Sequence, residues 1–383
     1  MLSPMTDADL PFALDDVGEI AHRFRTFADT VVRRLPLYHR LCAAASEDRD
    51  VVALLCDART DQRIPNLLLA AVHFLLLGGA EDPLADWYGS VTPHPRPVGS
   101  GEDDPWPHFR RLALEAPEVR SSIATRATQT NEVGRCGPLL LALDHIVGSA
   151  PSTIAERPRS LGLVEVGASA GLNLLLDRYG YQIVPDGGEL HASSPLILEM
   201  EARGSIRPRL PDAFPHITSR VGLDREPVDL RHRDQARRLV ACQWPDQPER
   251  LHRTRTAIAL AHGDLPTVVR GDAVDDLAPL VIDVAPVSLP VVVATWTISY
   301  LPPERRRALL AELDRLGEVR DLSFVVAEQP EAVPGLAIPP RPDGRPDGAP
   351  TALVVFHWRD GVRRAERLAD MHPHGTWIEW LVD

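Results

Sequence analysis

The chain contains no lysine, and all 41 of its lysine-plus-arginine positions are arginine. A P-loop uses a lysine to reach the bound phosphates, and Schiff-base and pyridoxal chemistry need a lysine amine. The sequence therefore excludes these sites, and it excludes lysine as a catalytic base.

Cysteine and long apolar runs are also scarce. The longest strongly apolar run, Leu67 to Leu77, is shorter than the ~18 residues that span a bilayer, and the acidic N-terminus does not resemble a signal peptide. We therefore expect a cytoplasmic protein with no membrane partner. A zinc site or a disulfide framework is not indicated either, because no C-x-x-C pair occurs among Cys42, Cys56, Cys136 and Cys242.

The charge of the chain is strongly negative, with a net value of -13 over 383 residues. Nucleic-acid binding takes its affinity from clustered cations, so this balance disfavours DNA or RNA as a partner. A small-molecule substrate is the expected partner.

The first part of the chain has a helical pattern. Apolar residues recur at three- and four-residue spacing from Asp15 to about Gly148, and no convincing strand occurs there. We predict an N-terminal helical domain over residues 1–150, acting as a lid over the substrate.

The second part alternates short β-branched runs with helices. "LGLVEVG", "SRVGLD", "TVVRGD", "LPVVVATW" and "LSFVVAE" are typical of buried strands, and "ALVVFHWRDG" follows near the end. We predict an α/β fold over residues 151–383, with a Rossmann-like, doubly wound, mostly parallel sheet. An inserted hairpin at about 180–215 is expected from "YQIV" and "PLILEMEA".

The stretch "LVEVGASAGLNLL" from Leu163 allows two interpretations. Its G-x-S-x-G could be a hydrolase nucleophile elbow with Ser169 as the nucleophile, and later acids and histidines satisfy the chain order of a triad. Only helices precede it, however, and no Gly-rich oxyanion loop is visible. The triad candidates are Asp224 or Asp272, followed by His357, His372 or His374.

The favoured interpretation is a cofactor loop between a strand and a helix. Such a loop points backbone N–H groups at a ligand, with Gly167 and Gly171 allowing close approach past Ala168 and Ser169. Glu165, two positions before the first glycine, suits a ligand with an ammonium group. S-adenosylmethionine (SAM) has one.

The ends of the later strands resemble those of class I SAM-dependent methyltransferases. That resemblance implies that Asp224 accepts the ribose hydroxyls, Asp272 receives the adenine amino group, and Ala273 contacts the ring edge. It places Thr295 and Trp296 where cofactor and substrate meet. The alternative for both aspartates is a helix cap.

The whole chain also resembles a bacterial family catalogued as domain of unknown function 2332. The resemblance rests on "TQTNEVGRC", "VEVGASAGLNLLLDRYGY", "VVRGDA", "YLPPE" and "HPHGTWIEWL". It implies a methyltransferase-like fold and brings no reaction with it. Two features depart from the methyltransferase pattern. Ser169 stands where a glycine is usual, and about sixty positions separate Glu165 from Asp224. The insertion would account for this long separation.

Further polar residues are candidates for substrate contact and catalysis. Tyr300 and Glu328 follow predicted strands and are candidate catalytic groups. His372 and His374 form H-x-H without a third ligand at suggestive spacing, so no metal is expected. The substrate or lid candidates are Gln129, Asn131, Glu132, Arg135 and His374, with a simple helix cap as the alternative for the "TQTNEVGR" segment.

These observations favour a SAM-dependent methyltransferase acting on a small metabolite. The segment "ATWTISYLPP" lacks the D/N-P-P-Y signature of many amino-group methyltransferases, so oxygen or carbon acceptors are favoured over nitrogen. The alternatives are a SAM-binding protein that does not methylate and, less favoured, the α/β-hydrolase.

Overall fold

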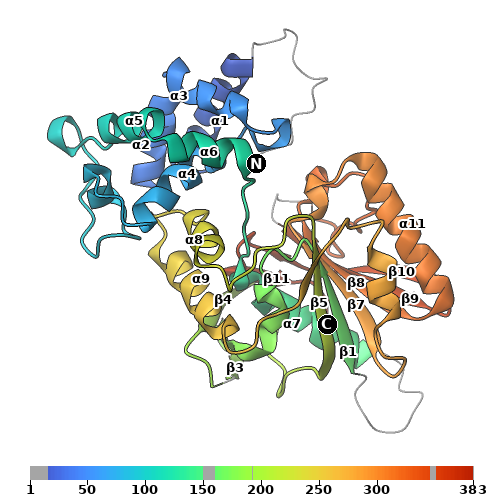
Figure 1. Cartoon of the computed structure of the whole chain (residues 1–383). Coiled ribbons are helices and arrows are strands. Elements are labelled where there is room, and N and C mark those ends of the chain that lie inside the picture. The colour runs from blue at the N-terminus through green and yellow to red at the C-terminus, as the bar shows by residue number, and fades with distance from the viewer. Residues whose placement is uncertain (1–15, 150–159, 192, 346–350, 383) are drawn as a thin grey trace. The chain divides into compact units, whose positions relative to one another are not determined.

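The structure is a computed structural model that describes residues 16–149, 160–191, 193–345 and 351–382. The chain divides into two compact units (Figure 1). Unit 1 comprises Met1–Thr130 and Asp229–Arg255, and unit 2 comprises Asn131–Val228 and Thr256–Asp383. Asp15 and the expected domain boundary at residue 150 lie outside the described residues, and residues 131–149 belong to unit 2 with the sheet.

Unit 1 is helical throughout its described part. Its elements are joined by loops and short 3-10 turns, and α9 continues past Arg255 into unit 2. Proline stands at the start of several of these helices, where its fixed φ suits the first turn. The helices are α1 (Asp16–Thr30), α2 (Pro36–Ala45), α3 (Arg49–Ala53), α4 (Pro65–Leu77), α5 (Trp106–Glu115), α6 (Pro117–Thr125), α8 (Arg233–Ala241) and α9 (Pro248–Ala261).

Helix α4 is the centre of unit 1. It is apolar on all sides, and nine of its 13 residues are buried, which is the pattern of a helix inside a core. Its polar residue His73 is fully buried and contacts Ala241 O at 2.9 Å and Ser90 Oγ at 2.6 Å. The late segment 229–255 thus closes the core that the first 130 residues begin.

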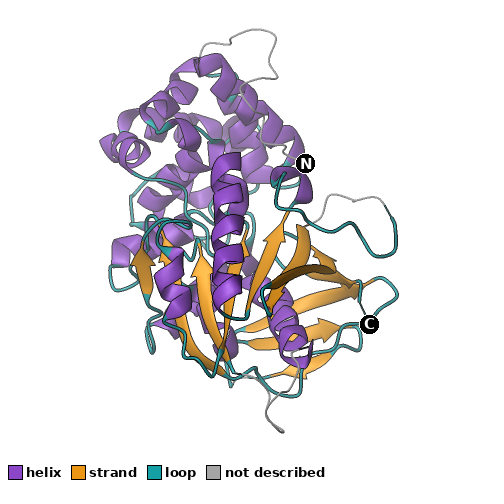
Figure 2. Ribbon diagram, turned by 90° about the vertical axis from the view of Figure 1, so that its right-hand side faces the viewer, coloured by secondary structure: helices purple, strands orange, loops and turns teal. Residues whose placement is uncertain are grey.

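Unit 2 contains a mixed sheet, whose strands are orange in Figure 2. Its 11 strands lie in the order β3-β2-β4-β11-β10-β9-β8-β7-β1-β5-β6. Six of the strand pairs are parallel and four are antiparallel, so the sheet is mostly parallel. The strands are β1 (Leu161–Val166), β2 (Gly180–Val184), β3 (Gly188–Leu190), β4 (Ile197–Arg203), β5 (Ile217–Asp224), β6 (Val268–Arg270), β7 (Leu289–Thr295), β8 (Leu322–Glu328), β9 (Thr351–Arg359), β10 (Val362–Met371) and β11 (Trp377–Trp380).

Three further helices accompany the sheet in unit 2: α7 (Cys136–Ser149), α10 (Leu277–Ile282) and α11 (Pro303–Val319). Leucines of α10 and α11 share one apolar cluster with alternate residues of β1, β7, β8 and β9. Helix α7 contacts β4, β8 and β9. Strands β1, β7 and β8 are buried along their whole length, which explains their continuous apolar sequences.

The expected inserted hairpin is wrong in its pairing. "YQIV" (β2) forms its hairpin with β3, and it pairs in parallel with β4, the strand that "PLILEMEA" contributes. Strand β4 also pairs in parallel with β11, so the insertion extends the main sheet. A hairpin needs antiparallel neighbours, and the chain between β2 and β4 is long enough to return to the same end of the sheet.

The topology reverses beside β1. After β1 the chain first forms β2, β3 and β4 at the far end of the sheet, then adds β5 and β6 on one side of β1, and then returns to β7 on the other side of β1. In open parallel sheets such a reversal separates the loops that follow the two central strands, and ligands bind in that crevice. Within the described part of the chain, no helix has the length and apolar character needed to cross a membrane.

Two glycine substitutions in unit 2 test the packing of the helices. An alanine Cβ at Gly317 of α11 would lie 2.1 Å from Cδ1 of Trp358, which is 1% exposed. Gly317→Ala is therefore expected to lower the free energy of unfolding by about 1–3 kcal/mol, as overpacking does. Gly148 of α7 has open space around the same position. Gly148→Ala should raise the free energy of unfolding by about 0.5 kcal/mol.

Urea denaturation of both variants measures this contrast. Equal effects of the two substitutions would contradict the close contact between α11 and β9.

Candidate functional site

The loop after β1 has an unusual backbone. Gly167, Ser169 and Gly171 have φ values of 72°, 54° and 73°, and a 3-10 segment, η6 (Leu172–Arg178), follows directly. Left-handed backbone is costly for a residue with a side chain, so Ser169 must be held there by its surroundings. Its carbonyl accepts a 3.0 Å hydrogen bond from the N–H of Val228.

The two glycines permit close packing of this loop on neighbouring elements. A Cβ at Gly167 would lie 2.3 Å from Oγ1 of Thr297, which follows β7. A Cβ at Gly171 would lie 2.9 Å from Pro266 and Val268 at β6. The predicted close approach at these glycines is therefore made to the protein itself.

Asp224, at the end of β5, holds the loop in place. Its Oδ2 accepts the backbone N–H of Ser169 at 2.8 Å, and its Oδ1 accepts that of Glu226 at 2.8 Å. Each carboxylate oxygen can accept a second hydrogen bond, so the contacts to the loop leave acceptor capacity. Next to Ser169, Ala168 is fully buried.

Glu165 is buried in β1 with a single hydrogen bond. It is 2% exposed, and its Oε1 accepts from Nδ2 of Asn173 at 2.9 Å. Its Oε2 has no hydrogen-bond partner among the described residues. Burial raises the pKa of Glu165 to about 8, and the nearby carboxylate of Asp224 adds to the rise, while Asn173 and Arg135 oppose it.

Glu328 is a second buried carboxyl group, at the end of β8. Its Oε1 accepts the backbone N–H groups of Thr297 at 2.5 Å and Ile298 at 2.6 Å. Its Oε2 has no hydrogen-bond partner among the described residues. Burial raises the pKa of Glu328 to about 7, against the opposing hydrogen bonds from the backbone of Ile298 and Thr297, the charge of Arg135 and the side chain of Ser299.

Arg135 supplies the positive charge beside these carboxyl groups. Its guanidinium donates to Thr295 O at 3.0 Å and to Pro373 O at 2.8 Å. It lowers the pKa of both Glu165 and Glu328, so its charge acts on both. Tyr300, the other proposed catalytic residue, lies in η7 (Ile298–Tyr300) and is 76% exposed.

The segment before α7 lies against the same loop. The side-chain Oδ1 of buried Asn131 accepts the backbone N–H of Leu172 at 2.8 Å. Buried Glu132 accepts the N–H of Gly134 at 3.2 Å. A Cβ at Gly134 would lie 2.2 Å from His374 O, so the loop that carries His374 packs on this segment. Of the remaining predicted substrate residues, Gln129 belongs to unit 1.

Three predicted cofactor residues make other contacts. Asp272 accepts the N–H of Val274 at 2.9 Å and forms an ion pair with Arg305 of α11, as a residue that organises a turn does. Ala273 is buried beside it in the apolar cluster under α10 and α11. The indole Nε1 of Trp296 donates to Thr351 Oγ1 at 2.9 Å.

Two further side chains, those of Asn173 and Thr297, shape the site. Asn173 bonds Glu165, and the thiol of Cys136 contacts Asn173 Oδ1 at 3.4 Å. Thr297 fills the space beside Gly167. The eight-residue separation of Glu165 and Asn173 across a tight turn was the available signal for the first pair.

The structure does not assemble a hydrolase triad around Ser169. Its Oγ is buried and makes no hydrogen bond with any described residue. Of the histidines in that interpretation, His357 contacts Ser323 Oγ at 3.0 Å, and Nδ1 of His372 accepts the N–H of His374 at 3.1 Å. Across the described residues, no group of three or more potential ligands could hold a metal ion.

The family model described as "Uncharacterized protein conserved in bacteria (DUF2332)" matches residues 21–380. The chain belongs to this family. The match spans both units and confirms the resemblance to domain of unknown function 2332. No curated protein matches the chain.

The buried carboxyl group of Glu165 predicts a pH-dependent stability. Its folded pKa of about 8 lies above the ordinary value of 4.5, so its contribution is complete below pH 4.5 and is lost as pH rises through 8. Glu165→Gln does not titrate. Its free energy of unfolding should therefore gain on that of the wild type as pH rises, by up to about 1.4 kcal/mol per pH unit.

Denaturation at a series of pH values measures this difference. Glu318→Gln, which removes an exposed carboxylate from α11, is the control and should follow the wild-type profile. Parallel profiles for Glu165→Gln and the wild type would contradict the raised pKa.

Proposed function

We propose that the carboxyl edge of the sheet around β1 and β7 binds SAM, and that the protein is a SAM-dependent methyltransferase. The observation that carries the proposal is a set of three buried oxygens without a hydrogen-bond partner among the described residues: Glu165 Oε2, Ser169 Oγ and Glu328 Oε2. An unpaired buried polar atom costs about 1–3 kcal/mol, so most such atoms have partners. A ligand that donates hydrogen bonds would satisfy all three.

The charge of the site favours a cationic ligand. Glu165, Asp224 and Glu328 lie at the ends of three strands, with the guanidinium of Arg135 acting on two of them. SAM carries an ammonium and a sulfonium group, and both suit a site that is negative when its carboxyl groups ionise. Arg135 suits the carboxylate at the methionine end of the same ligand.

The position of the site in the sheet also supports the proposal. The loop from Gly167 to Gly171 follows β1 directly beside the reversal of strand order. Ligands of doubly wound sheets bind at this place, outside the carboxyl ends of the strands. The remaining acceptor capacity of Asp224 is available to ribose hydroxyl groups.

The protein residues then have defined roles. When bound, SAM supplies an electrophilic methyl group, and the acceptor is a small metabolite that reacts through oxygen or carbon. Glu165 holds the ammonium group, and Asp224 keeps the loop in its left-handed form. Glu328, with a pKa of about 7, takes the proton that a hydroxyl acceptor loses as its new bond forms.

Binding of S-adenosylhomocysteine, the demethylated product, tests the cation site. A cation beside Glu165 requires its carboxyl proton to leave, so affinity should rise with pH and level off above about pH 8, the pKa of the free carboxyl group. Glu165→Gln keeps the shape and the Asn173 contact while removing the charge. It should weaken binding about ten- to hundredfold and remove the part of the pH dependence that comes from Glu165, leaving only that of Glu328 with its pKa of about 7.

Calorimetry measures both effects, with Glu318→Gln as the unchanged control. Absence of binding by the wild-type chain would overturn the proposal. Binding without any methyl transfer to a metabolite extract would leave a SAM-binding protein in place of an enzyme.

Ser169 separates the cofactor loop from the hydrolase interpretation. Ser169→Gly removes the hydroxyl and its proposed hydrogen bond but relaxes the left-handed backbone at φ 54°, so this variant should bind S-adenosylhomocysteine no more than about tenfold more weakly than the wild type. Ester hydrolysis by the wild type, lost in both Ser169→Gly and Ser169→Ala, would instead restore the nucleophile elbow.

A further inference from the structure

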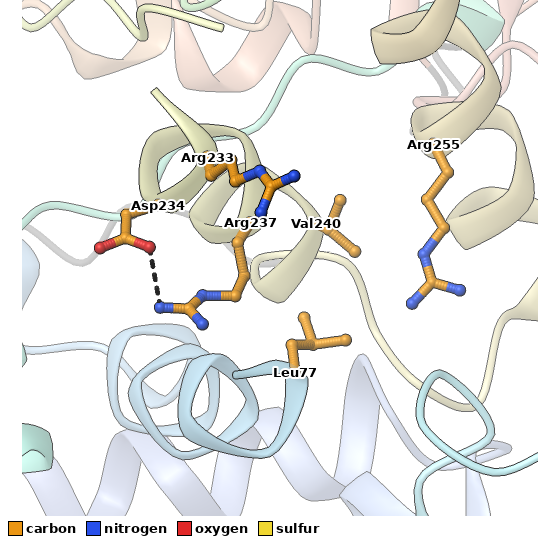
Figure 3. Close-up of a pocket in the computed structure, with 6 residues that line it drawn as sticks. All are labelled: Leu77, Arg233, Asp234, Arg237, Val240 and Arg255. Carbon is orange, nitrogen blue, oxygen red and sulfur yellow. Dashed lines mark hydrogen bonds and ion pairs between the residues drawn. The ribbon is translucent and has the colours of Figure 1, made fainter. Parts of the chain in front are cut away.

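Unit 1 contains a second candidate site. It is a pocket of about 480 Å³ formed by α4, α8 and α9 (Figure 3). Its lining residues are Leu77, Arg233, Asp234, Arg237, Val240 and Arg255. Three arginines and one aspartate line the pocket, so the lining carries a net positive charge.

This positive lining stands out against the charge of the chain. The segment from residue 229 to 255 contains seven arginines and four acidic residues, whereas the whole chain has a net charge of -13. Arg233, Arg237 and Val240 are spaced by four and three positions along α8, which places them on one face of the helix. Two of the three arginines therefore line the pocket from one face of α8, and the third, Arg255, lines it from α9.

The arginines are held in place without using all of their donors. The guanidinium of Arg237 lies 4.0 Å from the ring centroid of Phe74 and donates to Asp234 Oδ1 at 3.0 Å, and Arg255 donates to Ser90 O at 2.8 Å. An arginine has five N–H donors, and Nε of Arg237 is buried without a partner among the described residues. The guanidinium of Arg233 makes no hydrogen bond or ion pair with any described residue.

The pocket also has an apolar part. In Figure 3, Leu77 and Val240 lie between the guanidinium groups of Arg237 and Arg255. Helix α8 begins at Arg233 without a side-chain cap, so its positive end adds to the charge of the arginines. This combination suits an organic anion, with its charge on the arginines and its carbon skeleton on the apolar side chains.

We propose that this pocket binds the phosphate group of a small phosphorylated metabolite. A phosphate monoester carries nearly two negative charges and three acceptor oxygens, which matches several arginine forks better than a carboxylate does. The proposal is independent of the SAM site, because every lining residue belongs to unit 1.

Calorimetric titration of the full chain tests the ligand class. Inorganic phosphate, phenyl phosphate and acetate are compared at equal ionic strength, because salt screens exposed charges. Phosphate should bind at least about tenfold more tightly than acetate, and phenyl phosphate more tightly than phosphate because its ring covers Leu77 and Val240. Phenyl phosphate binding no tighter than phosphate would overturn the assignment to an organic ligand.

Three exposed substitutions test the location. Arg233→Gln should weaken phenyl phosphate binding about tenfold or more, and Asp234→Asn should strengthen it several-fold by removing the competing carboxylate. Arg120→Gln is the control, since Arg120 lies in the same unit with a side chain that is 68% exposed. No binding up to about 10 mM, or equal affinity in Arg233→Gln and the wild type, would overturn the proposal.

Discussion

The left-handed backbone from Gly167 to Gly171 is the constraint on which the candidate site depends. Ser169 adopts φ 54° although it has a side chain, and two side chains distant in sequence hold the loop. Asp224 accepts the N–H of Ser169, and Asn131 accepts the N–H of Leu172. Because these two acceptors come from the ends of different elements, the loop geometry exists only when the sheet and the segment before α7 are assembled.

Sequence reasoning found the strands that are buried on both faces and also partly exposed strands such as β5 and β6. β1, β7 and β8 have continuous apolar sequences because both of their faces lie inside the protein. Strand β10 was missed, since its first half, "VRRA", is exposed and charged and only its second half is buried. The pairing of β2 with β4 was also missed, because strand direction depends on the path of the intervening chain and leaves no local pattern.

The candidate site, too, was predictable from the sequence only in part. The motif around Glu165 and Ser169 and the strand-end position of Asp224 were readable from local sequence, and the structure brings these residues together. The hydrogen-bond and ion-pair partners of the site's side chains could not be predicted from the sequence. Asp272 binds Arg305 of α11, and Glu328 accepts two backbone N–H groups from the loop after β7, through contacts that span 33 and 30–31 residues. The sequence indicates which residues end a strand, whereas the hydrogen-bond and ion-pair partners of those residues depend on the folded structure.

The discontinuity of unit 1 has a consequence for the order of folding during synthesis. The core around α4 needs the 229–255 segment, whose Asp246 caps α2 by accepting the N–H groups of Leu37 and Tyr38 at 3.0 and 3.1 Å. Chains grow from the N-terminus, and domains fold as units once their residues are available. The first 130 residues therefore leave the face of α4 that α8 covers exposed until α8 has been synthesised. By then β1 and β5 are already synthesised, so the two units must complete their cores over the same stretch of translation.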